Sequence, residues 1–230
     1  MELNEIGRNI ESIFHQVIAK KEELETEYGW ENTDARMTIF NKMGSILSAV
    51  NTGYFLMNIY LSDINWWRQF NASVPDRNIK RAFWDFERFF KIGVIQDLFS
   101  CVESSFQIYV RTIDPSACSN GTTEFKNIYT WLLNKTNLQG SIPLLDLWRN
   151  VRNTMHNNGT FLPSNGKNQT VIYKECSYVF NNGEAISFMT TELILLLIAD
   201  LLKLVENIVI STPIVSIHDI EELNFSDYPE

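Results

Sequence analysis

The sequence predicts a mainly α-helical protein, a multi-helix bundle with a small β-meander or hairpin inserted at about residues 170–188. Apolar residues recur every three or four positions along most of the chain, which is the helical period. The period changes to alternation only after Gly159. No internal repeat or low-complexity linker divides the chain, so we expect a single domain over 1–230. Its parts are an N-terminal helical layer (1–75), a helical core with the β-insert (76–212) and an acidic C-terminal tail (213–230).

The first 75 residues predict two or three helices. Apolar residues lie at helical spacing from Ile6 to Ile18, with charged and amide side chains on the other face. Gly29 and the polar residues 31–34 end this helix and supply an N-cap for a second one, which carries apolar positions from Ile39 to Val50. The second helix either continues past Gly53 or breaks there, before a helical segment over 54–70. Residues 71–75 predict a loop.

The next helices are predicted by long apolar stripes and by proline positions. Residues 76–113 contain no proline and predict the longest helix pair, kinked at Gly93. Asp114 and Pro115 close that region, and a shorter helix follows from about residue 124 to 133. Pro143 suits the first turn of a further helix, which ends at Gly159.

The end of the chain combines a β-insert with one more helix. Val171, Tyr173, Tyr178 and Phe180 alternate with polar residues, and Asn182-Gly183 is a turn signal before further apolar residues at 186 and 188. This pattern predicts the β-meander. Helical periodicity resumes over 191–210, and the chain from Pro213 onward is predicted to be irregular.

Composition limits the classes of function. The net charge of −9 argues against a broad nucleic-acid-coating surface, so any contact with RNA must be local. The three cysteines form no CxxC pair and suggest neither a disulfide framework nor a zinc site. The N-terminus has no signal-peptide core, and the most apolar run, Leu193 to Ala199, is too short to span a bilayer. We expect a cytoplasmic protein with no membrane contact.

The segment from Trp148 to Gly159 is the stretch whose composition suggests a functional site, because it contains two Arg, four Asn and one of only three His. In a helix, residues three, four and seven positions apart share a face. We therefore expect one face to carry Arg149, Arg152, Asn153 and His156. Guanidinium groups beside an imidazole suit a phosphodiester, because Arg binds phosphate oxygens in pairs and His transfers protons near neutral pH.

Arg149-Asn150, five further residues and then His156 resemble the R-x4-6-H signature of the HEPN superfamily. The resemblance implies a small all-α bundle that forms a homodimer and cleaves RNA without metal or cofactor, although some members only bind. It implies that His156 accepts a proton from a ribose 2′-hydroxyl or donates one to the leaving 5′-oxygen. Arg149 would then hold the scissile phosphate, with Asn150 as the polar neighbour that completes the catalytic set.

Further residues are assigned to support this site. Arg152, Asn153 and Asn157 are expected to bind substrate, and Arg152 could substitute for Arg149 although it lies outside the family spacing. Glu103 lies in an apolar stretch, where a buried carboxylate needs a partner. It either orients Arg149 or Arg152, or it is an exposed charge. No metal ligand set is expected, because His15 and His218 have no Cys, His or carboxylate neighbours at ligand spacing.

Two other interpretations remain open at this stage. Cations near a helix C-terminus gain about 0.3–1 kcal/mol each from the helix dipole, so the Arg and His residues need no catalytic role. The chain would then be a non-catalytic helical interaction module, antitoxin-like or a scaffold for a partner protein, or a nucleotide- or RNA-binding module. The acidic charge fits this alternative better. The motifs of nucleotide-cofactor enzymes and metallohydrolases are absent.

A second cationic set precedes the motif segment. Arg77, Lys80, Arg81, Arg88 and Lys91, with Trp84 between them, fall on one face of the long predicted helix. Basic residues interleaved with an aromatic ring can bind single-stranded RNA by charge contact and base stacking. The same pattern is typical of the solvated face of an amphipathic helix.

Overall fold

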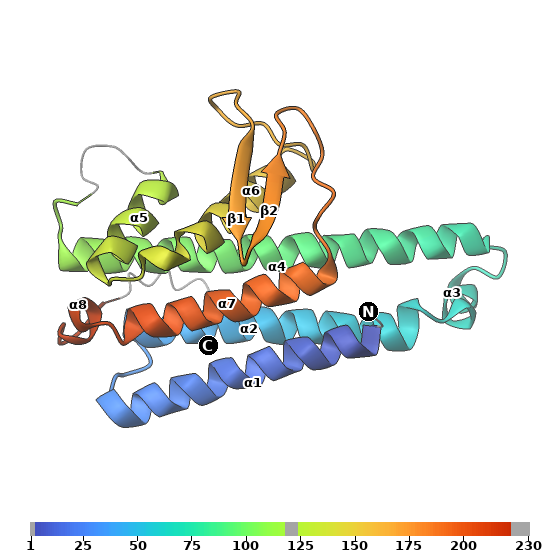
Figure 1. Ribbon diagram of the computed structural model, residues 1–230. Helices are drawn as coiled ribbons and strands as arrows, with labels where there is room; N and C mark the ends of the chain where they lie inside the picture. The colour runs from blue at the N-terminus through green and yellow to red at the C-terminus, as the bar shows by residue number, and fades with distance from the viewer. Residues whose placement is uncertain (1–2, 118–123, 222–230) are drawn as a thin grey trace.

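The computed structural model describes residues 3–117 and 124–221, and this part of the chain is mainly helical with one two-stranded sheet (Figure 1). The predicted fold class is confirmed at this level. The elements are α1 (Leu3–Tyr28), α2 (Ala35–Leu56), the π-helical turn η1 (Met57–Leu61), α3 (Ile64–Phe70), α4 (Asp76–Ile113), α5 (Phe125–Lys135), the 3₁₀ turn η2 (Gln139–Ser141), α6 (Ile142–His156), β1 (Gln169–Tyr173), β2 (Cys176–Phe180), α7 (Thr191–Val209) and α8 (Thr212–Val215).

The helices form layers on two sides of α4. Figure 1 shows α1 and α2 on one side, and α5, α6 and the hairpin on the other. The apolar helix α7 contacts α1, α4 and α6, so it joins the two sides. Its buried residues, among them Leu197, Leu201 and Val205, lie around much of the helix. The first 75 residues therefore form a layer that is separated from α6 by α4.

α4 is one continuous helix of 38 residues, so the expected pair of helices is wrong. Gly93 lies inside the helix, and a Cβ built there would meet no atom within 4 Å. A glycine without proline or an inserted group is not enough to break a helix. The C-terminal half of α4 is buried in the core at positions such as Leu98, Phe106 and Tyr109. Its N-terminal half extends beyond α6 and remains largely exposed (Figure 1).

Gly53 does not break α2, which continues to Leu56. A Cβ at this position would lie 2.1 Å from Cε1 of Phe90, so only glycine allows the ring of Phe90 on α4 to pack against the α2 backbone. The chain changes direction only after the π-helical turn, which begins four residues beyond Gly53 and ends at Leu61. Gly53 is therefore a packing position between two helices.

The segment after Pro213 starts in the short helix α8, which we did not expect, and the chain from 216 to 221 belongs to no named helix or strand but packs on the core. Ile214 and Ile220 are fully buried. The guanidinium of the buried Arg36 donates hydrogen bonds to the backbone carbonyls of Ile214, Ile217 and His218, at 3.2, 2.8 and 3.2 Å. The segment packs on the core because these hydrogen bonds hold it to Arg36, a residue far away in the sequence. The rest of the predicted acidic tail, 222–230, lies outside the described residues.

The β-insert is an antiparallel hairpin in which Val171 lies opposite Tyr178. Lys174 and Glu175 form its turn with φ values of 47° and 64°, the conformation that suits a two-residue hairpin turn. The expected third strand at 186 and 188 is wrong, because the segment makes only an isolated bridge between Thr160 and Ala185. The ring of Phe188 instead packs against the hairpin, and its centroid lies 5.2 Å from that of Tyr178 and 5.1 Å from that of Phe180.

Candidate functional site

α6 has Pro143 in its first turn, as predicted, and ends at His156, three residues before the predicted end. Its apolar side, including Leu147, Trp148 and Val151, is buried in the core. Gly159 has a φ of 87°, which lets its N–H donate to the Thr154 carbonyl at 2.9 Å and close the helix. The core contacts and the cap together fix which side of α6 faces outward.

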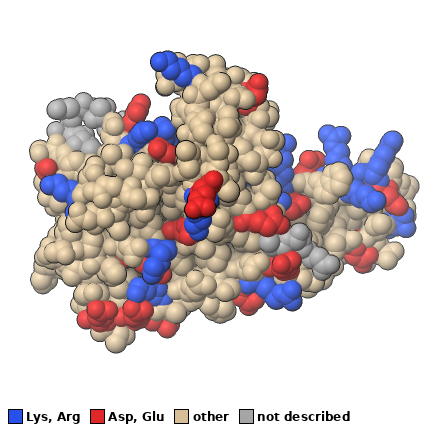
Figure 2. Space-filling view, in the orientation of Figure 1, with Lys and Arg blue, Asp and Glu red and all other residues tan. Residues whose placement is uncertain are grey.

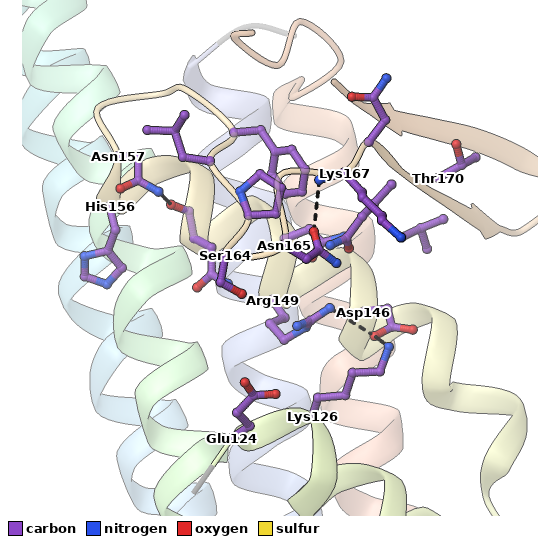
Figure 3. Close-up of a pocket in the computed structure, with 18 residues that line it drawn as sticks. Glu124, Lys126, Asp146, Arg149, His156, Asn157, Ser164, Asn165, Lys167 and Thr170 are labelled. Carbon is purple, nitrogen blue, oxygen red and sulfur yellow. Dashed lines mark hydrogen bonds and ion pairs between the residues drawn. The ribbon is translucent and has the colours of Figure 1, made fainter. Parts of the chain in front are cut away.

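The outward side of α6, the start of α5 and the loop before β1 enclose a cavity of about 760 Å³, which we call the α6 pocket (Figure 3). The predicted site residues that line it are Arg149, Asn150, Asn153, His156 and Asn157. Arg152 and Glu103 do not line it. The structure therefore brings five of the seven predicted residues to one cavity.

Arg149 is held at the wall of the pocket but retains an unused donor. Its Nη2 lies 3.7 Å from Oδ1 of Asp146, and its buried Nε has no hydrogen-bond partner among the described residues. The same Asp146 oxygen accepts a hydrogen bond from the Tyr129 hydroxyl and lies 3.4 Å from Nζ of Lys126. Burial and the bond to Asp146 raise the pKa of Tyr129, so this hydroxyl remains a donor. Asp146 thus orients three groups at once.

Asn150 is almost fully buried, with 2% of its surface exposed. Its Nδ2 donates a 3.0 Å hydrogen bond to Oε1 of Gln169, the first residue of β1. Its backbone carbonyl accepts from the Thr154 hydroxyl at 2.7 Å. Asn150 therefore ties the hairpin to α6 and shapes the pocket, which is a positioning role.

His156 lies exposed at the edge of the pocket. In the described part of the chain, its imidazole makes no hydrogen bond or ion pair. Figure 3 shows the ring pointing away from Arg149, whose guanidinium points toward Asp146. The two residues share a cavity, but within one chain their functional groups do not converge.

Arg152 points toward α4, so the expectation that it shares the face of Arg149 is wrong. Its guanidinium carbon lies 5.2 Å from the centre of the Phe99 ring, and its Nη1 donates to Oδ1 of Asn153 at 3.3 Å. A three-residue step leaves a side chain about 60° away around a helix, and here that offset moves Arg152 out of the pocket. Of the two arginines, only Arg149 can bind a ligand there.

Glu103 belongs with Arg152, on the α4 side of α6. Burial raises the pKa of the Glu103 carboxyl, and the positive charge of Arg152 partly opposes that rise. Of the two arginines that were expected as its partner, Arg152 is the one whose charge acts on Glu103.

Sequence reasoning missed the pocket residues that come from other elements. Lys126 on α5 and Lys167 in the loop before β1 line the pocket, together with the amides of Asn165 and Asn168. Asp146 could have been found, because it lies three residues before Arg149 on the same helix. The lysines have no such signal, since only the tertiary fold brings them to α6.

The pocket is cationic on balance although the chain is acidic. Lys126, Arg149 and Lys167 supply three positive charges, against the two negative charges of Glu124 and Asp146. No group of three His, Cys, Asp or Glu side chains within 3–117 and 124–221 is arranged to hold a metal ion. Across the same two ranges, no helix is long and apolar enough to cross a membrane. An anion is therefore the ligand class that the charges favour.

Comparison with known proteins assigns no family to the chain. No protein-family model matches it, and neither the curated proteins nor the solved structures contain a match. The likeness to the HEPN signature consequently depends on the spacing of Arg149 and His156 alone.

Proposed function

We propose that the α6 pocket binds an RNA phosphodiester, and that the protein is a HEPN-like, metal-independent endoribonuclease that acts as a homodimer in the cytoplasm. The observation that carries the proposal is the buried Nε of Arg149, which lacks a partner at the wall of a cationic cavity. A buried donor without a partner costs free energy, and a phosphate oxygen would supply the missing acceptor.

The surroundings of Arg149 support RNA as the source of that phosphate. In Figure 3, Lys126 and Lys167 lie on either side of Arg149, so they could neutralise neighbouring phosphates of one strand. The amide side chains of Asn153, Asn165 and Asn168 line the same cavity. Amides both donate and accept hydrogen bonds, as the edges of unpaired bases and the ribose 2′-hydroxyl require.

His156 is the residue that could perform the chemistry. As a base it would remove the proton of the 2′-hydroxyl, whose oxygen then attacks phosphorus while the bond to the 5′-oxygen breaks. An acid must give that oxygen a proton, and the products are a 2′,3′-cyclic phosphate and a 5′-hydroxyl. Because Arg149 and His156 point apart in one chain, we propose that a second copy completes the site.

The first test is cleavage of single-stranded RNA in EDTA by the wild type, His156→Ala and the control His15→Ala. His15 is also exposed, and it lies in α1. We expect the wild type and the control to release cyclic-phosphate products and His156→Ala to lose at least about 100-fold in rate. Equal cleavage by all three proteins, or by none, would refute the nuclease proposal.

A mixing experiment tests the shared site. Arg149→Ala and His156→Ala chains are each expected to be inactive as purified dimers. When the two are mixed and allowed to exchange subunits, one intact Arg149 can face one intact His156, and part of the activity should return. If exchange is verified by mass spectrometry and no activity returns, the second copy does not complete the site.

A binding module without catalysis is the second candidate, and one observation favours it. The Arg149 guanidinium is turned toward Asp146 and away from His156, an arrangement that anchors a ligand without bringing acid and base together (Figure 3). This candidate predicts RNA binding that depends on Arg149 and no cleavage by any variant. The cleavage assay separates the two candidates.

A further inference from the structure

The exposed first half of α4 differs in charge from the rest of the molecule. Between residues 76 and 91 there are five Lys or Arg and three Asp or Glu, a net charge of +2, whereas the whole chain carries −9. Figure 2 shows basic side chains projecting from the end of the molecule where α3 and the start of α4 lie. Trp84 lies among them and is 67% exposed. An exposed indole ring among cations offers a flat surface on which a nucleobase can stack.

Three of these cations are available to a ligand. Arg81 lies 3.8 Å from Asp85, and Nζ of Lys91 lies 2.7 Å from Glu87, so their charges are partly used within the helix. Across the described ranges, Arg77, Lys80 and Arg88 form no ion pair. We call the surface formed by Arg77, Lys80, Trp84 and Arg88 the α4 track.

The α4 track leads to the end of α6. Trp84 and Arg88 line a second cavity, of about 500 Å³, whose other wall includes Met155 and Asn158. The α6 pocket is lined by Asn153, His156 and Asn157 from the same last turn. The two cavities therefore lie on either side of the terminus of α6, which carries His156.

We propose that the α4 track binds single-stranded RNA that continues from the α6 pocket, with a base stacked on Trp84 and phosphates on Arg77, Lys80 and Arg88. This inference depends on the proposed binding of RNA at the α6 pocket. From Arg77 to Arg88 the helix rises about 16 Å, the length of about five stacked nucleotides. The substrate class is thus an unpaired strand several nucleotides long.

The neighbours of Trp84 favour a nucleic acid over a lipid surface. Trp84 lines a cavity together with Arg88 and Lys91, so a flat base can stack on the ring while its phosphates meet the cations. The exposed Phe89 lies nearby, so binding to a membrane is one of the outcomes that the test must separate. Stacking and charge contact also tolerate any sequence. The track therefore adds affinity without selecting bases.

The test compares two 2′-O-methyl oligoribonucleotides, a dinucleotide and a strand of about 12 nucleotides, which cannot be cleaved because the nucleophile is blocked. Binding is measured by fluorescence anisotropy with the wild type, Trp84→Ala and the triple variant Arg77→Ala/Lys80→Ala/Arg88→Ala. A matched triple variant, Arg8→Ala/Arg111→Ala/Lys203→Ala, removes three exposed cations elsewhere. Circular dichroism verifies that all the variants fold.

Both track variants should bind the longer strand more weakly and the dinucleotide as the wild type does. We expect a loss of about 5- to 100-fold for Trp84→Ala, since one stacked base is removed. The triple variant should lower the slope of log affinity against log salt by about 2, because three phosphate contacts are lost. The matched triple variant should change neither quantity.

The outcomes distinguish a failure of the α4 track from a failure of the α6 pocket proposal. If the wild type binds both oligonucleotides and the track variants bind the longer one equally well, the track is refuted and the α6 pocket proposal stands. If the wild type binds neither, both proposals fail. If track variants lose binding to phosphatidylserine vesicles but keep RNA affinity, the surface is a lipid-binding site and the inference is wrong.

Discussion

The two sides of α4 each contain an Arg–Asp pair, and the pairs differ in how completely the arginine is satisfied. On the α1–α2 side, Arg36 is fully buried, its Nε and Nη2 donate to Asp34, and its Nη1 donates to two backbone carbonyls. On the α6 side, Arg149 has 20% of its side chain exposed, a 3.7 Å ion pair with Asp146 and an Nε without a partner in the described chain.

The difference separates a structural arginine from one that can bind a ligand. Arg36 also lies 4.1 Å over the Trp30 ring, so it has no remaining contact to offer. Its role is to join the start of α2 to residues 214–218. Arg149 keeps a donor without a partner and lines a cavity, so it can bind a phosphate where Arg36 cannot.

The largest effect is expected on the α1–α2 side of α4, from Arg36→Ala. The substitution leaves Asp34 buried without its cation and removes the donors of three backbone carbonyls. We expect the free energy of unfolding to fall by about 3–5 kcal/mol in urea denaturation. The exposed Arg111, replaced by alanine, should change it by less than about 0.5 kcal/mol. A loss for Arg36→Ala as small as that of the control would remove the contrast between the two arginines.

A pair of glycine variants measures how tightly α2 packs against α4. Gly53→Ala places a methyl group 2.1 Å from the Phe90 ring and should destabilise the protein by about 1–3 kcal/mol. Gly93→Ala meets no atom within 4 Å and should stabilise α4 by up to about 1 kcal/mol. Thermal unfolding of the two variants should therefore shift in opposite directions, and a shift in the same direction would contradict the packing described for α2 and α4.

Asn150→Ala tests whether this residue positions the hairpin against α6. The lost hydrogen bond to Gln169 should cost about 1 kcal/mol of unfolding free energy. In a double-mutant cycle, Gln169→Ala should add little once Asn150 has been replaced. Fully additive effects would show that the two side chains are not coupled.

Glu103 provides the smallest expected effect, a pH dependence. Burial raises the folded pKa of its carboxyl, so its protonation favours the folded state. Its contribution to stability is present below its ordinary unfolded pKa and is lost as the pH rises through the raised folded value. The unfolding free energy of the wild type, measured relative to Glu103→Gln, should decline as the pH rises above the ordinary carboxyl pKa of 4.5. A flat difference would argue against a buried carboxyl beside Arg152.

The fold was predictable where local signals act alone. Pro143, the apolar side of α6 and Gly159 define that helix in sequence, and the structure has it from Ile142 to His156, three residues short of the predicted end. The continuity of α2 through Gly53 was not predictable, because it depends on the Phe90 ring of another helix. The third strand was predicted wrongly for a similar reason, since Phe188 packs by its side chain against the hairpin instead of pairing its backbone.

The site was also predictable only where its residues lie on one helix. Helical spacing placed Arg149, Asn153 and His156 at one pocket, as the structure has them. The spacing could not reveal that Arg152 turns toward Phe99, because an offset of about 60° matters only when the neighbouring helix is known. Nor could it reveal Lys126 and Lys167, which reach the pocket from two other segments.

The most direct test of the central claim is the affinity of the wild type and Arg149→Ala for an uncleavable 2′-O-methyl RNA in EDTA. We expect the variant to keep the wild-type unfolding free energy to within about 1 kcal/mol. We also expect about 10- to 100-fold weaker binding, because a charge-assisted contact to phosphate is lost. Equal affinity for the two proteins would contradict the claim that Arg149 binds an RNA phosphate.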